Sequence, residues 1–228
     1  MIREGKLPAV PRLELVTNWA QRERDLLCDL LLAAGPAAPT LCGDWTTLDL
    51  AAHLILRERR PDAAPGIVVP WASLRRYTER VQRSIAQSER SWPELVATVR
   101  GGPPLWSPLR FGPLDEVANT VEFFVHHEDV RRAVPDWEPR TLDAGLEHAL
   151  GKALGRLRAL IRRAPGGLEL HTPDGAVVLA KPGQPMVVAI APASELLLFA
   201  YGRQNHARVE LSGSEPATLA VLGARFGL

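Results

Sequence analysis

The segment Leu114–Ala133, LDEVANTVEFFVHHEDVRRA, decides the fold because it predicts one long helix that carries two possible metal ligands. Pro113 suits the first turn of a helix; acidic residues follow near the positive end of the helix dipole, and two arginines lie near its negative end. Glu122 and His126 are four residues apart, so both side chains project from one face of this helix. Two such donors can share one ion if a facing helix supplies a third ligand, as in metal sites of helical bundles.

The helical repeat of apolar residues also occurs elsewhere in the chain, between capping and stop signals. Thr46 followed by Asp49, and Ser91 followed by Glu94, are typical of capping boxes at helix N-termini. The predicted helices are, in chain order, Leu13–Ala34, Thr46 to just before Pro61, Trp71–Ile85, Ser91 to Gly101, Leu114–Ala133, one marked by Leu142 through Leu160 and ended by Gly166, Ala193–Tyr201, and a last one from about Glu215.

Beyond residue 166 the sequence changes from helical periodicity to short runs of β-forming residues separated by turns rich in Pro, Gly and Asp. The predicted strands are Leu168–His171, Ala176–Ala180, Met186–Ile190 and Arg208–Leu211. We therefore predict a mainly α protein in two parts, a helical bundle over residues 1–165 and a small α+β domain over residues 166–228.

The composition is that of an ordinary globular protein, since 46% of the 228 residues are hydrophobic and 23% are charged. The net charge of +1 argues against a nucleic-acid partner, which calls for a basic excess on one face. No apolar run reaches the roughly 18–20 residues of a bilayer span, and no export signal is found. Cys28 and Cys42 match no zinc or redox spacing, and Cys28 lies on the apolar side of its helix. We therefore expect a cytoplasmic protein with reduced thiols and no membrane contact; the sequence leaves its oligomeric state open.

His53 is the natural third ligand for the pair on the later helix. It lies on the apolar stripe of its own helix, where a polar ring needs a buried partner. Two imidazoles and one carboxylate suit zinc with an open coordination position, and the same set suits non-haem iron(II). Spacing alone leaves two interpretations open: a metal site formed by His53, Glu122 and His126, or a histidine that is hydrogen-bonded within the core.

Several short segments resemble motifs of the mycothiol-dependent maleylpyruvate isomerase family, which belongs to the wider group of DinB-like four-helix bundles. Leu41–Thr46 (LCGDWT), leading into Asp49–Leu54 (DLAAHL), is similar to the first metal-ligand motif of that family. Glu122–Val130 (EFFVHHEDV) is similar to the second motif. Glu195–Leu197 and Tyr201–Arg203 resemble parts of the small domain that follows the bundle, so the resemblance spans most of the chain.

The resemblance implies a DinB-like four-helix bundle followed by a small α+β domain. It places the family's ligands on His53, Glu122 and His126, which hold a divalent ion: zinc, with iron or nickel as alternatives. It also implies mycothiol or another small thiol as co-substrate, a small organic substrate, and an isomerase or transferase reaction in which the metal-bound thiolate is the nucleophile. The segment Pro61–Gly112 matches no known substrate pocket of the family.

Other residues near these motifs have two interpretations each. Arg110 and Arg203 are candidate anchors for a substrate carboxylate, because a guanidinium pairs with such groups bidentately. A surface or interdomain salt bridge is the commoner role for an arginine and is the alternative for each. His127 lies beside the ligand histidine but about 100° around the helix from the face of Glu122. Asp129 shares the face of the ligand histidine and can orient its imidazole or add a fourth oxygen.

Two rival functions remain open at this stage. The ion could activate a water molecule for hydrolysis, with Asp129 or His127 as the general base. The protein could instead be a non-catalytic module that binds a metal or a ligand, because a bundle that holds an ion need not turn anything over. The chain contains no Gly-rich phosphate loop and no Gly-x-Ser-x-Gly elbow, which argues against nucleotide-dependent and serine-hydrolase functions.

Overall fold

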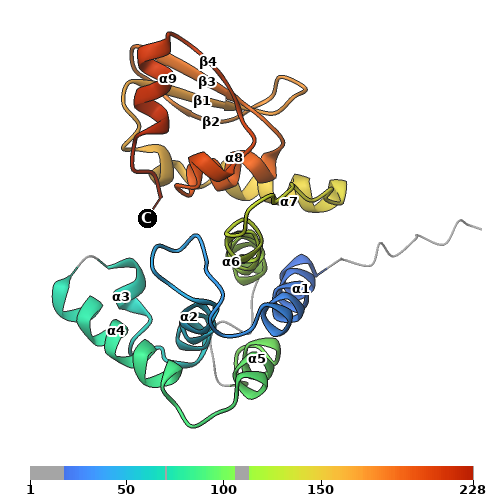
Figure 1. Cartoon of the computed structure of the whole chain (residues 1–228). Coiled ribbons are helices and arrows are strands. Elements are labelled where there is room, and N and C mark those ends of the chain that lie inside the picture. Colours follow the sequence, from blue (N-terminus) through green and yellow to red (C-terminus); the bar gives the residue numbers. More distant parts are fainter. Residues whose placement is uncertain (1–17, 70, 106–112, 228) are drawn as a thin grey trace, which may run out of the picture.

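The computed structural model describes residues 18–69, 71–105 and 113–227, and it is mainly helical with one small sheet (Figure 1). The first part comprises α1 (Trp19–Ala34), α2 (Thr47–Arg59), α3 (Pro65–Val68), α4 (Ala72–Ala86), α5 (Trp92–Arg100) and α6 (Pro113–Arg131). The second part comprises α7 (Ala144–Leu154), η2 (Arg158–Ile161), β1 (Gly167–His171), β2 (Val177–Lys181), β3 (Met186–Ile190), α8 (Ala193–Ala200), η3 (Gln204–His206), β4 (Glu210–Ser212) and α9 (Glu215–Leu222).

Both predicted capping boxes are confirmed. The backbone N–H of Thr46 donates to Asp49 Oδ2 at 3.0 Å, and the N–H of Asp49 donates back to Thr46 Oγ1 at 3.4 Å. In the same way the N–H of Ser91 donates to Glu94 Oε2 at 2.8 Å. These bonds satisfy amides that have no partner inside the helix, so they define where α2 and α5 begin. The start of α2 in turn sets the position of His53 two turns along that helix.

Helix α6 is the central element, because helices α1 to α5 lie on one side of it and the elements from α7 onward lie on the other (Figure 1). Its neighbouring phenylalanines divide between two cores: Phe123 packs with α1, α2 and α5, whereas Phe124 packs with α7 and the sheet. Successive residues of a helix point about 100° apart, which allows one helix to serve both cores. The faces of α6 between the two cores are therefore where groups from both parts can meet.

The C-terminal part is a four-stranded sheet in the order β2-β1-β3-β4, with β1 and β3 parallel and the other pairs antiparallel. The three earlier predicted strands are confirmed to within one residue, and β4 begins two residues later than predicted. Every residue of α8 is buried, because this apolar helix packs against α7 and within the core that the sheet shares. This core includes the buried side chains Leu150, Leu154, Leu168, Leu170, Val187, Leu197 and Phe199.

The predicted long helix from Leu142 to Leu160 is wrong in its length. Helix α7 ends at Leu154 with Gly155 as its C-cap, and Arg158–Ile161 forms a separate 3₁₀ turn. A Cβ at Gly155 would lie 3.3 Å from the carbonyl oxygen of Val178, so the close approach of β2 favours glycine there. Periodicity missed this break because the apolar spacing continues across it.

The first predicted helix is tested only in part, and the predicted domain boundary is not tested. The first predicted helix is confirmed from Trp19 to Ala34, and its residues 13–17 lie outside the described ranges. The domain boundary at residues 165 and 166 stays a prediction; the buried side chains of α7 belong to the same cluster as those of the sheet. Among the described helices, none combines the length and the apolar character needed to span a bilayer.

Candidate metal centre

The three predicted ligands come together between α2 and α6. Glu122 Oε1 lies 3.3 Å from His53 Nε2 and 3.3 Å from His126 Nε2, and one ligand atom of each residue lies within 4.8 Å of the others. Ligand atoms about 2.0–2.1 Å from a tetrahedral zinc ion stand about 3.3–3.4 Å apart. The spacing of these donors, and their type, therefore suit a divalent ion.

The burial and hydrogen bonds of the three residues set their charge. Burial, as the largest effect, lowers the pKa of His53, against a hydrogen bond with Glu122, so this imidazole is held in the neutral form that binds metals. Burial alone would raise the pKa of Glu122, but hydrogen bonds from both histidines and the charge of Arg57 hold it well below its ordinary value. A carboxylate that stays ionised is a permanent negative centre for a cation.

A second group of side chains holds the ring of His126 through Nδ1, the nitrogen that does not face Glu122. Its Nδ1 lies 3.0 Å from Asp129 Oδ2, which leaves Nε2 facing Glu122. Asp129 is fully buried and accepts two further hydrogen bonds from Arg203, from Nε at 2.8 Å and Nη2 at 2.7 Å. Burial lowers the pKa of His126, but its bonds to Asp129, Cys42 and Glu122 outweigh this and raise it well above the ordinary value. In this arrangement Asp129 orients the imidazole through Nδ1, one of the two roles considered for it.

Cys42 is a residue of the centre that spacing rules missed. Its Sγ donates to Asp129 Oδ2 at 3.1 Å and lies 3.8 Å from His126 Nδ1, so that the three form a second group with metal-ligand atoms close together. The loop between α1 and α2, which carries Cys42, is bound to the end of α6: the N–H of Leu41 donates to the carbonyl oxygen of Asp129 at 3.0 Å. The available signal was the place of Cys42 within the segment that leads into the first ligand helix, not its distance from the other cysteine.

Arg57 is the second residue that the sequence did not single out. It lies one turn after His53 on α2, and its Nε is 3.5 Å from Glu122 Oε1. Its Nη1 donates to Asn119 Oδ1 at 2.6 Å, one turn before Glu122 on α6. A guanidinium therefore stands next to the same carboxylate oxygen that both histidines approach.

The remaining predicted residues have different surroundings. Arg203 donates to Asp129 twice and to the carbonyl oxygen of Tyr201 at 2.6 Å, so each of its nitrogens already has an acceptor; its role as a carboxylate anchor stays a prediction. Arg110 lies outside the described residues. His127 points toward α1, where its Nδ1 lies 3.1 Å from Glu23 Oε2, and is not part of the ligand cluster.

A comparison with protein-family models found no match, and a comparison with curated proteins found none either. Two solved structures match in fold: a mycothiol-dependent maleylpyruvate isomerase with a TM-score of 0.55, and a mutant form of such an isomerase with a TM-score of 0.50. Each is 16% identical in sequence, and each match covers 85% of this chain and 90% of the other. In fold, the chain resembles this isomerase. At this level of identity the similarity concerns the fold, and the functional argument depends on the residues described above.

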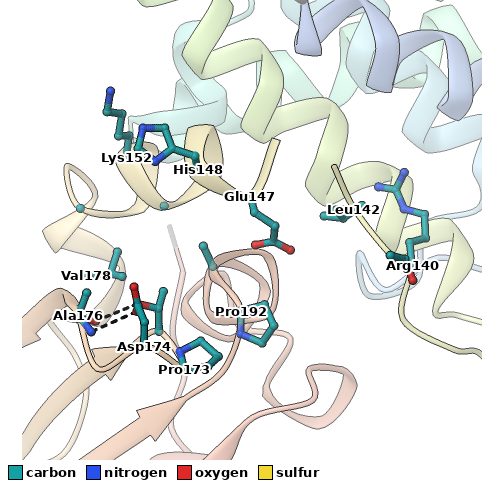
Figure 2. Close-up of a pocket in the computed structure, with 15 residues that line it drawn as sticks. Arg140, Leu142, Glu147, His148, Lys152, Pro173, Asp174, Ala176, Val178 and Pro192 are labelled. Atoms are coloured by element: carbon teal, nitrogen blue, oxygen red, sulfur yellow. Dashed lines mark hydrogen bonds between the residues drawn. The ribbon is translucent and has the colours of Figure 1, made fainter. Parts of the chain in front are cut away.

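A hollow lies between α7 and the turn that joins β1 to β2 (Figure 2). It has a volume of about 860 Å³ and a mainly apolar wall that includes Pro173, Val178 and Pro192. The carboxylate of Glu147 on this wall accepts bonds from the N–H and the hydroxyl of Ser194, at 3.0 and 2.6 Å. Its described lining residues do not include His53, Glu122, His126 or Arg203.

Proposed function

We propose that the protein is a divalent-metal enzyme that uses a small thiol, such as mycothiol, to isomerise a small organic substrate or transfer a group to it. The observation that supports this most is the meeting of His53, Glu122 and His126, from two helices far apart in the sequence, with donor atoms at ligand spacing. The fold similarity to a mycothiol-dependent isomerase favours a thiol as the co-substrate. Zinc suits this donor set best, with iron or nickel as alternatives.

The proposal includes finer assignments of the fold. Helices α1, α2, α5 and α6 would form a DinB-like four-helix bundle, with the domain boundary near residue 165. We also propose the cytoplasm as the location, since the proposed chemistry needs reduced thiols.

Within this proposal each side chain has a defined task. His53, Glu122 and His126 would hold the ion, whose positive charge lowers the pKa of a thiol so that it reacts as the thiolate. Asp129 fixes the His126 ring through Nδ1, and Arg203 keeps Asp129 in place with two hydrogen bonds. The ring of Trp45 packs against that of His53, with the ring centroids 5.1 Å apart.

Thiol chemistry is favoured over an activated water molecule because both candidate bases are engaged elsewhere. His127 is buried against Glu23 on α1, and Asp129 is bound by His126 and Arg203. A general base must come within hydrogen-bond reach of the proton that it removes, and neither residue is free to do so.

Cobalt substitution tests the proposed thiol. We expect a sulfur-to-cobalt charge-transfer band when a small thiol such as 2-mercaptoethanol is added to the cobalt-loaded protein, because the three ligands leave one position open. The Glu122→Gln variant, treated in the same way, should show no such band. A cobalt-loaded wild-type protein whose spectrum does not change with the thiol would contradict the thiol proposal and favour water chemistry or a passive site.

A further inference from the structure

The position of Arg57 raises an electrostatic problem for the proposed ion. Its Nε lies 3.5 Å from Glu122 Oε1, the oxygen that stands between the two ligand histidines. A divalent cation held there would share this carboxylate with the guanidinium, at close range and with both groups largely shielded from water: the side chain of Arg57 is 16% exposed and that of Glu122 24%. The single negative charge of Glu122 cannot balance both a divalent cation and the guanidinium, so a further anion bound near both would lower their repulsion.

We infer that Arg57 binds the anionic ligand that occupies the open position of the site, and that it thereby makes cation binding and anion binding depend on each other. The inference rests on the proposed function and assigns a residue and a ligand charge to it. The anion is a thiolate or a carboxylate, both of which a guanidinium can bind while they contact a metal ion.

Arg57 suits this role better than Arg203 because its carboxylate partner among the described residues, Glu122, is itself a proposed metal ligand. Arg203 is paired by two hydrogen bonds with the fully buried Asp129, whose Oδ2 also lies 3.0 Å from His126 Nδ1. The hydrogen bond of Arg57 to Asn119, by contrast, is to a neutral amide, and its carboxylate partner among the described residues is Glu122. When Glu122 binds an ion, no second carboxylate in the described part of the chain pairs with Arg57.

The guanidinium is also held in a suitable place. Asn119 is buried on α6, one turn before Glu122, and fixes Nη1 at 2.6 Å. The third nitrogen, Nη2, has no hydrogen-bond partner among the side chains that the structure describes, and so it can donate to a ligand. A fixed cation with an open donor beside a metal ligand lowers the ordering cost of binding an anion there.

The test measures cobalt affinity by chelator competition, without any activity assay. It uses the wild type, Arg57→Gln, Arg57→Lys and the matched control Arg60→Gln, which removes an arginine at the exposed end of the same helix. Each protein is measured with no added anion, with acetate, and with 2-mercaptoethanol, in a buffer of non-coordinating ions. The gain in affinity that each anion causes is the coupling factor, and comparing acetate with 2-mercaptoethanol shows which anion class the site prefers.

We expect the coupling factor of the wild type to exceed that of Arg57→Gln by about tenfold for at least one anion, within the usual range of coupling between sites. Arg57→Lys should retain most of it and Arg60→Gln all of it. Without added anion, Arg57→Gln should bind cobalt more tightly than the wild type because the repulsion is gone. Equal coupling factors in all four proteins would overturn the inference while leaving the metal site intact. A wild type that binds no cobalt would overturn the proposed function itself.

Discussion

At the scale of single residues, the centre depends on which atoms of a few side chains face one another. Asp129 holds Nδ1 of His126, so that Nε2 is the atom left for a ligand role. The three candidate ligands could be singled out from the sequence because i, i+4 spacing and an apolar stripe are local features. Cys42 and Arg57 could not be found in this way, because they join the centre only through the packing of a loop and of α2 against α6.

The two cysteines should differ sharply in reactivity. Cys28 is fully buried, and burial raises the pKa of its thiol to about 11, so iodoacetamide should leave it unmodified at pH 7.5. Cys42 is partly exposed and should be alkylated. Its Sγ lies 3.8 Å from His126 Nδ1, so bound metal should slow the alkylation. Peptide mass spectrometry checks this; labelling of Cys28 before Cys42, or labelling of Cys42 at one rate with and without metal, would contradict it.

At the scale of elements, α2 and α6 were predictable because their ends are marked by caps and dipole charges as well as by periodicity. Where these capping and charge signals were missing, the ends of helices were not predicted correctly. Helix α7 ends at Leu154, and its C-cap Gly155 lies close to the carbonyl oxygen of Val178 on β2, a contact that cannot be predicted from the local sequence. The short helix α3 also has no amphipathic signal, since four residues complete only one turn.

The cap of α2 provides a prediction with an internal control. Thr46→Ala and Ser91→Ala should each lower the free energy of unfolding by about 1 kcal/mol, because each removes a hydroxyl from a capping box. Only Thr46→Ala should also weaken metal binding, since α2 carries His53 and α5 carries no ligand. Urea unfolding and chelator competition measure the two effects. Equal metal affinity in both variants would show that the start of α2 does not help to place the ligand.

At the scale of the whole molecule, a buried network of charges joins the helical part to the C-terminal part. Arg132, the residue after the end of α6, donates to Glu128 on that helix and to Glu195 on α8, at 2.6 Å each. Arg140 donates to Glu128 at 2.7 Å and to Glu23 on α1 at 2.8 Å. Glu23, Glu128, Arg132 and Glu195 are nearly inaccessible to water, and Arg140 is 17% exposed. Removing the charge of Glu128 would therefore leave buried partners without their counter-ion. The network therefore holds α6 in the position where its ligands can face α2.

Glu128→Gln should for this reason lower the free energy of unfolding at pH 7 by about 3–5 kcal/mol. The matched change Glu79→Gln, in an ion pair that is more than half exposed, should cost less than about 0.5 kcal/mol. Chemical denaturation of both variants checks this. Similar losses in the two would mean that the network contributes no more than a surface pair.

The same network predicts an acid-sensitive fold. Burial alone would raise the pKa of Glu128, but the charge of Arg140 and a hydrogen bond from Arg132 lower it below 4.5, and Glu23 is lowered through His127 and Arg140 against its own burial. A carboxyl whose pKa is lower in the folded chain stabilises it above the unfolded pKa and stops doing so as the pH falls through the folded value. Stability should therefore decrease from about pH 4.5 downward, and less steeply in Glu128→Gln; identical pH profiles would contradict this assignment.

The central claim is that one ion binds where α2 meets α6, and metal content measures it most directly. After loading with zinc and dialysis, elemental analysis should find one ion per chain in the wild type and in His148→Ala, an exposed histidine on α7. His53→Ala and Glu122→Gln, with folding checked by circular dichroism, should lose most of the bound metal. Equal metal content in all four proteins would contradict the account.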